Sequence, residues 1–235
     1  MFENSETAIN ALKTVPFFSS LRRDEVNALA VRLVPRRFTP NQIIFHLGDP
    51  GGLLYILTQG KVKISCATPD GQEALLAILG PGNFFGELAL LDDSPRSATA
   101  MAIEPTETLT LHRDEFLNFL DNNPTFAHHV LQTLALRIRH LNSQISDIFF
   151  LDLPARLARI LLNLADNHGQ PTKQGTLIDI SLTQTDMAEM TGATRVSINK
   201  ALARFRRAGW ILISGRHITI ANREKLEELI QMAGG

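Results

Sequence analysis

The sequence predicts an α+β fold in which an N-terminal, jelly-roll-like β-roll precedes one long helix and a C-terminal winged helix-turn-helix. Short apolar stretches separated by turn residues occupy residues 37 to 111, which favours many short strands. A heptad pattern then follows Asn123-Pro124, and two helical patterns joined at Gly192 precede two short strands. With 235 residues, 44% of them hydrophobic, the chain is long enough to bury two cores.

Turn residues recur at regular spacing through the first half of the chain. They are Gly48-Asp49-Pro50-Gly51-Gly52, Gln59-Gly60, Pro69-Asp70-Gly71 and Gly80-Pro81-Gly82. The apolar stretches between them, such as 54–57, 62–65 and 75–79, have the length of strands. An antiparallel β-roll is therefore expected, preceded by a helix over 21–33.

The long helix after Asn123-Pro124 carries a narrow apolar seam. Its residues alternate in spacing between three and four: Leu131, Leu134, Ile138, Leu141, Ile145 and Ile148. The flanks, including Arg137 and Asn142, stay polar. This seam predicts a homodimer, and the alternative is a helix packed on its own domain.

A hinge is expected at Phe150-Leu151-Asp152-Leu153-Pro154, where the seam stops. Asp152 suits a helix N-cap and Pro154 is tolerated in the first turn. We expect the next helix to end near Gly169, with a polar loop and a short strand over 177–182 after it. The predicted domains are an N-terminal effector domain (1–125), a dimerisation helix (126–151) and a C-terminal domain (152–235).

The helix-turn-helix is predicted from two caps and one turn. Thr183 caps a short helix with Asp186 three residues on, Gly192 permits the turn, and Thr194 caps a second helix. Its inward residues are Ile198, Ala201, Leu202 and Phe205, and strands 211–214 and 217–220 around Gly215-Arg216 form a wing.

Charge separates the two halves of the chain. Residues 1–151 hold 12 Lys and Arg against 16 Asp and Glu, whereas residues 152–235 hold 11 against 8. No acidic residue lies between Thr191 and Asn222. A basic face on the second helix predicts a double-stranded DNA partner, the alternative being a solvated basic helix. The expected DNA contacts are Thr183, Thr194, Arg195, Val196, Ser197, Asn199, Lys200, Arg204 and Arg216.

Composition argues against several other classes of protein. No apolar run reaches the length of a membrane span, and Met1 to Asn10 hold two Glu and no Lys or Arg, unlike a secretory signal. A cytoplasmic protein with no membrane partner is expected. One cysteine, Cys66, cannot form an internal disulfide and is interpreted as a small buried strand residue. No two of the seven histidines have i, i+4 spacing, and no metal site is expected.

At this point the order of parts resembles the family of the cyclic-AMP receptor protein and the fumarate–nitrate regulator (CRP/FNR), from about Val15 to Ile220. The most specific segments, Gly86-Glu87-Leu88-Ala89-Leu90-Leu91 and Pro95-Arg96-Ser97-Ala98, look like the family's phosphate-binding cassette. The resemblance implies a cyclic nucleotide in the β-roll, with its phosphate on Arg96 and Ser97, its ribose 2′-hydroxyl on Glu87, and close approach at the Gly86 backbone. A guanidinium suits a phosphodiester, whereas a carboxylate suits a hydroxyl donor.

The same resemblance identifies residues that depart from the family's pattern. Alignment on the hinge places Leu141 and Asn142 at the base-contacting positions. Asn142 offers adenine a donor and an acceptor, but Leu141 replaces the usual hydroxyl residue. Val196 stands where the best-known member has an acidic base reader, so a different operator is expected. RNA polymerase is a further partner that the resemblance implies.

The expected function is an effector-gated transcription regulator that binds cyclic AMP and, as a homodimer, a palindromic operator. One alternative is a regulator of the same family that is independent of nucleotide or senses another effector. A second is a regulatory subunit acting on a protein partner. A third is a cyclic-nucleotide hydrolase, which would need a metal cluster or a carboxylate pair beside Glu87. No catalytic residue and no cofactor other than the effector is assigned.

Overall fold

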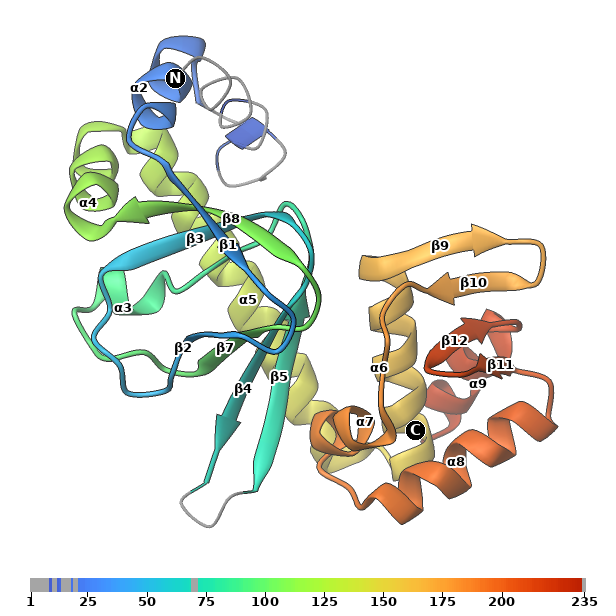
Figure 1. Ribbon diagram of the computed structural model, residues 1–235. Coiled ribbons are helices and arrows are strands. Elements are labelled where there is room, and N and C mark those ends of the chain that lie inside the picture. Colours follow the sequence, from blue (N-terminus) through green and yellow to red (C-terminus); the bar gives the residue numbers. More distant parts are fainter. Residues whose placement is uncertain (1–8, 10–11, 14–17, 19–20, 69–71, 234–235) are drawn as a thin grey trace. The chain divides into compact units, whose positions relative to one another are not determined.

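The computed structural model describes residues 9, 12–13, 18, 21–68 and 72–233, within two compact units, Met1–Ile138 and Arg139–Gly235 (Figure 1). The boundary between the units lies inside helix α5 (Pro124–Phe150). The turn predicted at Pro69-Asp70-Gly71 and nearly all of the N-terminal stretch considered for a signal lie outside the described residues.

The first unit contains the predicted β-roll. It consists of two four-stranded sheets, with strand orders β1-β8-β3-β6 and β2-β7-β4-β5, and every pairing between neighbours is antiparallel. The strands are β1 (Val34–Phe38), β2 (Ile43–Phe45), β3 (Leu53–Gln59), β4 (Val62–Ala67), β5 (Glu73–Leu79), β6 (Phe84–Phe85), β7 (Thr99–Ala102) and β8 (Thr106–His112). The jelly-roll-like part of the α+β fold is thus confirmed.

Helices of the first unit pack against one side of the roll through a phenylalanine cluster. They are α2 (Arg23–Ala30), α3 (Leu88–Leu91), α4 (Arg113–Asn122) and the start of α5. Phe126 of α5 is fully buried, stacks on Phe18 at 5.5 Å and meets Phe119 edge-on at 5.1 Å between ring centroids. This burial orients the N-terminal end of α5 on the roll.

A second apolar cluster fills the interior of the roll. Tyr55 stacks on Phe85 with ring centroids 5.0 Å apart, and Phe45 tilts against both rings. Burial raises the pKa of Tyr55, because the phenolate would lose hydration, although Arg96 and Arg36 oppose this rise.

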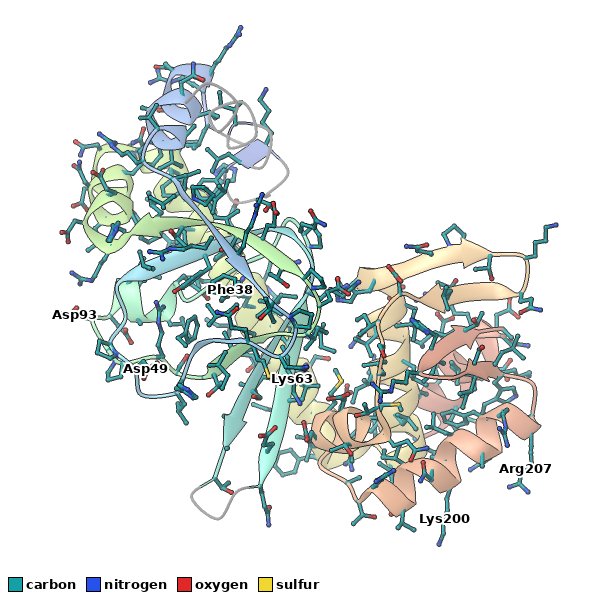
Figure 2. All side chains as sticks on the ribbon, in the orientation of Figure 1. Phe38, Asp49, Lys63, Asp93, Lys200 and Arg207 are labelled. Atoms are coloured by element: carbon teal, nitrogen blue, oxygen red, sulfur yellow. The ribbon has the colours of Figure 1, made fainter. Side chains whose placement is uncertain are left out.

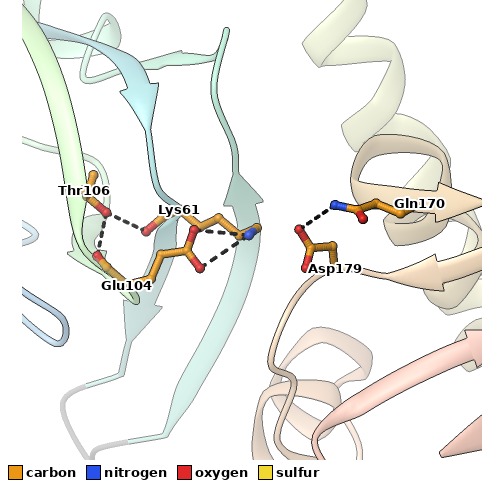
Figure 3. A network of polar contacts seen from close by, with 5 residues as sticks. All are labelled: Lys61, Glu104, Thr106, Gln170 and Asp179. Carbon is orange, nitrogen blue, oxygen red and sulfur yellow. Dashed lines mark hydrogen bonds and ion pairs between the residues drawn. The ribbon is translucent and has the colours of Figure 1, made fainter.

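Two connections at one edge of the roll are joined by polar contacts. Lys61, between β3 and β4, donates from Nζ to both carboxylate oxygens of Glu104, at 3.1 and 3.3 Å (Figure 3). The Thr106 hydroxyl lies 2.8 Å from the Glu104 carbonyl oxygen and 3.3 Å from that of Lys61. These contacts hold the β3–β4 connection beside the β7–β8 connection.

The second unit contains the remainder of α5 and the predicted winged helix-turn-helix. Its helices are α6 (Leu153–His168), α7 (Gln184–Thr191), α8 (Arg195–Arg207) and α9 (Arg223–Ala233). One antiparallel sheet has the strand order β11 (Ile211–Ser214), β12 (His217–Ile220), β10 (Gly175–Ile178) and β9 (Gly169–Thr172). The predicted start of α6 is confirmed, because the Asp152 carboxylate accepts a hydrogen bond from the Ala155 N–H at 2.9 Å and Pro154 lies in the first turn.

Two elements of the second unit differ from the sequence prediction. The strand expected over 177–182 is β10 (Gly175–Ile178), and the expected polar loop contains a partner strand, β9 (Gly169–Thr172). An exposed edge strand of polar residues shows no apolar alternation, so the pattern hides it. Gln170 of β9 donates to the Asp179 carboxylate at 3.1 Å, just after β10 (Figure 3).

Helix α9 was not predicted. It buries Leu226 and Ile230, and Arg223 at its start donates to both carboxylate oxygens of Asp166 on α6, at 2.6 and 3.1 Å. The hydrogen bond to Asp166 is the largest cause of the raised pKa of Arg223. Helix α9 therefore extends the core of the second unit beyond the wing.

Candidate functional site

Arg96 is a buried cation at the centre of the cassette-like segment. The residue is 4% exposed, and its guanidinium donates to the Gly86 carbonyl at 2.7 Å and to the Leu53 carbonyl at 2.8 Å. Its Nε is buried and has no hydrogen-bond partner among the described residues. The guanidinium carbon lies 4.3 Å from the centre of the Phe45 ring. Burial lowers the pKa of Arg96, and nearby Tyr55 and acidic groups partly offset this lowering.

Gly86 leaves room for that guanidinium. Its φ of +83° lies in the left-handed region that favours glycine. A Cβ at this position would lie 2.5 Å from Arg96 Nη1 and 3.1 Å from the Leu53 carbonyl oxygen. Only glycine, which has no Cβ, therefore allows the backbone at this position to lie so close to Arg96.

The loop before β3 packs on both halves of the cassette. The Arg96 N–H donates to the Asp49 carbonyl, and the Gly48 N–H donates to the Arg96 carbonyl, both at 2.9 Å. A Cβ on Gly51 would lie only 2.2 Å from the Cβ of Ala89. Asp49 and Asp93 lie on loops at the same end of the roll (Figure 2).

Glu87 is paired with Arg137, a residue that the sequence pattern places only on a polar flank of α5. The Glu87 carboxylate, 6% exposed as a residue, accepts a hydrogen bond from Arg137 Nη1. Arg137 Nη2 donates to the Phe84 carbonyl at 2.8 Å, and its guanidinium carbon lies 4.2 Å from the Phe84 ring centre. A buried carboxylate requires a partner for its charge, but the sequence does not indicate which cationic residue supplies it.

Arg113 connects the cassette to α4 and was also not singled out. Its Nε donates to the Leu90 carbonyl at 3.0 Å and lies 3.4 Å from the Asp93 carboxylate. Its N–H donates to the Gly52 carbonyl at 3.0 Å. Asp93, which has a φ of +59°, is thus held in a left-handed turn between Glu87 and Arg96.

The other predicted ligand residues differ in exposure. Ser97 and Leu88 are exposed, whereas Ala98 is buried beside Arg96 in the sequence. Leu141 and Asn142 are exposed and belong to the part of α5 in the second unit. Because Leu141 follows Arg137 by four residues on one continuous helix, the two lie on the same helical face.

Most of the heptad seam is exposed. Leu131, Ile138, Leu141, Ile145 and Ile148 are each between 52% and 65% exposed. Leu134 differs, because it packs against the core of the first unit. Packing on the chain's own domain therefore explains one residue of the seam and leaves five uncovered.

The helix-turn-helix has the predicted caps and turn. Thr183 Oγ1 accepts from the Asp186 N–H at 3.0 Å, and the Asp186 carboxylate accepts from the Thr183 N–H at 2.9 Å. Gly192 adopts a φ of +65°, and Thr194 caps α8 by accepting from the Ser197 N–H. The four predicted inward residues are all buried: Ile198, Ala201, Leu202 and Phe205. The wing strands β11 (Ile211–Ser214) and β12 (His217–Ile220) pair as expected.

The outer face of α8 is largely the predicted one, but Ser197 and Asn199 are only half-exposed. Arg195, Val196, Lys200 and Arg204 are exposed, and Lys200 and Arg207 extend from the same side of the helix (Figure 2). Arg195 Nε donates to Gln184 Oε1 at 3.3 Å. Asn199 was expected to be outward, but it is only half-exposed and its Oδ1 is buried without a hydrogen-bond partner among the described residues. The physical reason is that Asn199 follows the buried Ile198 on the flank of the helix.

In the described part of the chain, no helix is long and apolar enough to cross a membrane, and no group of three His, Cys, Asp or Glu side chains could hold a metal ion. Cys66 lies in β4 and is half-buried rather than buried.

Two domain families match the chain. The cyclic nucleotide-binding domain matches residues 35–123, and the Crp-like helix-turn-helix domain matches residues 155–229. A CRP-like cAMP-activated global transcriptional regulator of Mycobacterium tuberculosis is 37% identical over 211 residues, which cover 89% of this chain and 93% of that protein. A cyclic AMP receptor protein of Thermus thermophilus is 32% identical over 219 residues, covering 93% and 98%.

The fold is also similar to that of solved proteins. A CRP-family transcriptional regulator from Thermus thermophilus superposes with a TM-score of 0.71 and 28% identity, covering 85% of this chain and 98% of that one.

Proposed function

Because the chain belongs to the CRP/FNR family of DNA-binding transcription regulators, which are not enzymes, we propose that it binds a palindromic operator as a homodimer under the control of cyclic AMP. The alternative of a cyclic-nucleotide hydrolase is wrong for this chain, because the family consists of transcription regulators without enzymatic activity. Such a regulator acts on chromosomal DNA in the cytoplasm, and RNA polymerase is the further partner that we expect.

Buried Arg96 is the observation that carries the nucleotide proposal. Among the described residues, the two hydrogen-bond partners of its guanidinium are uncharged backbone carbonyls, and its buried Nε–H has no acceptor. A buried cation is stabilised by an anion that accepts hydrogen bonds from it. The singly charged phosphate of a cyclic nucleotide fits this requirement, with the exposed hydroxyl of Ser97 as a second donor.

The pair of Glu87 and Arg137 suggests how α5 would sense the ligand. A ribose hydroxyl that donates to Glu87 would compete with Arg137 for the carboxylate, and a freed Arg137 guanidinium would move toward the phosphate. Either change acts on α5, which ends at Phe150, just before the hinge that we propose at Asp152. Coupling between an effector and DNA in such systems is typically about 1–3 kcal/mol.

Cyclic AMP is the effector we favour. Two relatives above 30% identity are named for cyclic AMP, and Asn142 offers the base a donor and an acceptor. We propose Gly86, Glu87, Leu88, Arg96, Ser97 and Ala98 as the phosphate and ribose contacts, and Leu141 and Asn142 as the base contacts, with Arg137 added from the structure.

A second copy of the chain is the proposed cover of the seam on α5. Five apolar residues at heptad spacing are exposed on this helix. Covering them with an identical helix is favourable by about 25 cal/mol for each Å² of apolar surface buried. Two-fold symmetry would then present two copies of α8 to successive major grooves, about one helical turn of DNA apart.

The test is DNA binding by the full chain with and without nucleotide. An operator is first selected from random palindromes in the presence of cyclic AMP, and its affinity is then titrated against cyclic AMP, cyclic GMP and no nucleotide at two salt concentrations. We expect salt-dependent binding that cyclic AMP strengthens about 5–150-fold. Absence of salt-dependent duplex binding in every condition would overturn the DNA proposal.

One observation favours a second candidate, a regulator of the same family that does not need nucleotide. Arg137 already donates a hydrogen bond to Glu87 in this structure, and Leu141 has no hydroxyl at a position where the family resemblance implies one. In the same titration this candidate predicts equal operator affinity with and without every nucleotide.

A further inference from the structure

The outward row of α8 contains one large, exposed apolar side chain beside basic ones. Val196, in the first turn, is 63% exposed. The buried face of the helix consists of Ile198, Ala201, Leu202 and Phe205. At 3.6 residues per turn, the row directly opposite that face is Val196, Lys200, Ala203 and Arg207.

Val196 therefore faces away from the core of the unit. Lys200 and Arg207, from the same row, extend away from α8 into open space (Figure 2). Arg195 lies on the flank nearer α7, where Gln184 accepts a hydrogen bond from its Nε. If α8 enters a major groove, Val196 meets the floor of the groove before either flank does.

The floor of the major groove offers such a side chain one apolar feature. Guanine, adenine and cytosine present hydrogen-bonding groups there, and thymine adds its C5-methyl group. Valine has no hydrogen-bonding group, so packing it against a donor or acceptor would leave that group unpaired. We propose that Val196 determines specificity by packing on the C5-methyl group of a thymine in each half-site of the operator.

This inference rests on the proposed DNA-binding function and adds the base class that one residue selects. It differs from the roles of the neighbouring cations. Arg195 and Lys200 offer donors to guanine or phosphate, whereas Val196 contributes only apolar surface.

The experiment replaces single thymines of the selected operator by deoxyuridine, symmetrically in both half-sites. Deoxyuridine keeps every hydrogen-bonding group of thymine and lacks only the methyl group. At one thymine position the full-length protein should lose about fourfold in affinity per half-site, the value expected for one buried methyl group. The Val196→Ala variant should bind both duplexes with nearly equal affinity.

Val31→Ala provides a matched control. Val31 is 75% exposed and belongs to the other unit, so the same truncation there should leave the deoxyuridine penalty unchanged. Folding of both variants is checked by the fluorescence of the single tryptophan, Trp210, whose ring lies 5.4 Å from that of Phe205. Val196→Glu should move the preferred base at this position toward cytosine, whose amino group donates to a carboxylate.

The outcomes separate this inference from the function beneath it. If no operator can be selected, the DNA-binding proposal fails. If an operator is bound with strong salt dependence but no deoxyuridine position weakens binding, or if Val196→Ala keeps the full penalty, only the assignment of Val196 is overturned.

Discussion

The carboxylate of Glu87 accepts a hydrogen bond from the guanidinium of Arg137, which joins the segment after β6 to helix α5 within the first unit. The side chain of Glu87 is 8% exposed and that of Arg137 is 35% exposed. Glu87 is therefore the partner that depends on the pair, because its charge has little access to water.

Removing the cation should destabilise the protein. Arg137→Ala leaves the Glu87 carboxylate buried without this partner, so we expect the free energy of unfolding to fall by about 1–3 kcal/mol. Urea denaturation measures the change. Arg139→Ala, at an exposed position on the same helix, is the control. Equal losses in the two variants would mean that helix propensity, and not the pair, is responsible.

Arg96→Ala should abolish the response to nucleotide and leave the dimer intact. The variant loses the buried guanidinium proposed to hold the phosphate, and it also deprives the Gly86 and Leu53 carbonyls of their donors. Calorimetric titration with cyclic AMP measures binding, and light scattering measures mass. Arg37→Ala, which removes an exposed arginine, is the control. An unchanged titration in Arg96→Ala would refute the pocket assignment.

Gly51 and Ala89 should show strong coupling in a double-mutant cycle. Gly51→Ala places a Cβ 2.2 Å from the Ala89 Cβ, so we expect a loss of about 1–3 kcal/mol of stability. Ala89→Gly removes the clashing atom and costs about 1 kcal/mol in a helix. The double variant should be more stable than Gly51→Ala alone, and additive losses in thermal unfolding would show that the two residues are independent.

A charge in the seam of α5 should produce a monomer. Ile145→Asp would bury a carboxylate against its copy, which the dimer cannot tolerate, and operator affinity should fall with it. Leu136→Asp makes the same change at a position that is 66% exposed and outside the seam, and should remain dimeric. Light scattering across a concentration series measures both, and a dimeric Ile145→Asp protein would contradict the proposed interface.

Arg195 should contribute to sequence discrimination. Arg195→Ala should cost about 1–3 kcal/mol on the selected operator and much less on random DNA if the guanidinium contacts a guanine. Fluorescence anisotropy with both duplexes measures the difference. Lys225→Ala on α9 is a charge-matched control away from α8. An equal loss on both duplexes would make Arg195 a phosphate contact.

Elements governed by neighbouring residues could be predicted well. The caps at Asp152, Thr183 and Thr194 hold helices that begin one residue later, and the wing strands have the predicted bounds. A cap satisfies N–H groups two or three residues away, and amphipathic periodicity repeats within one or two turns. The information for these elements is therefore local.

Elements whose stability comes from distant partners could not be predicted. The edge strand β9 depends on pairing with β10, and α9 depends on Asp166 of α6, 57 residues away from Arg223. Arg137 and Arg113 acquire their roles from Glu87 and Leu90, which are 50 and 23 residues away. Neither arginine has a local pattern that distinguishes it from a surface cation.

The sequence by itself determined the order of β-roll, long helix and winged helix-turn-helix, together with the residue types of the cassette and the basic face of α8. Tertiary structure decided which cation pairs with Glu87 and that the Arg96 guanidinium is buried against backbone carbonyls. It also decided that Asn199 is partly buried while Val196 is exposed opposite the buried face of α8. The physical reason is that periodicity and capping act over a few residues, whereas burial and ion pairing depend on which surfaces the folded chain brings into contact.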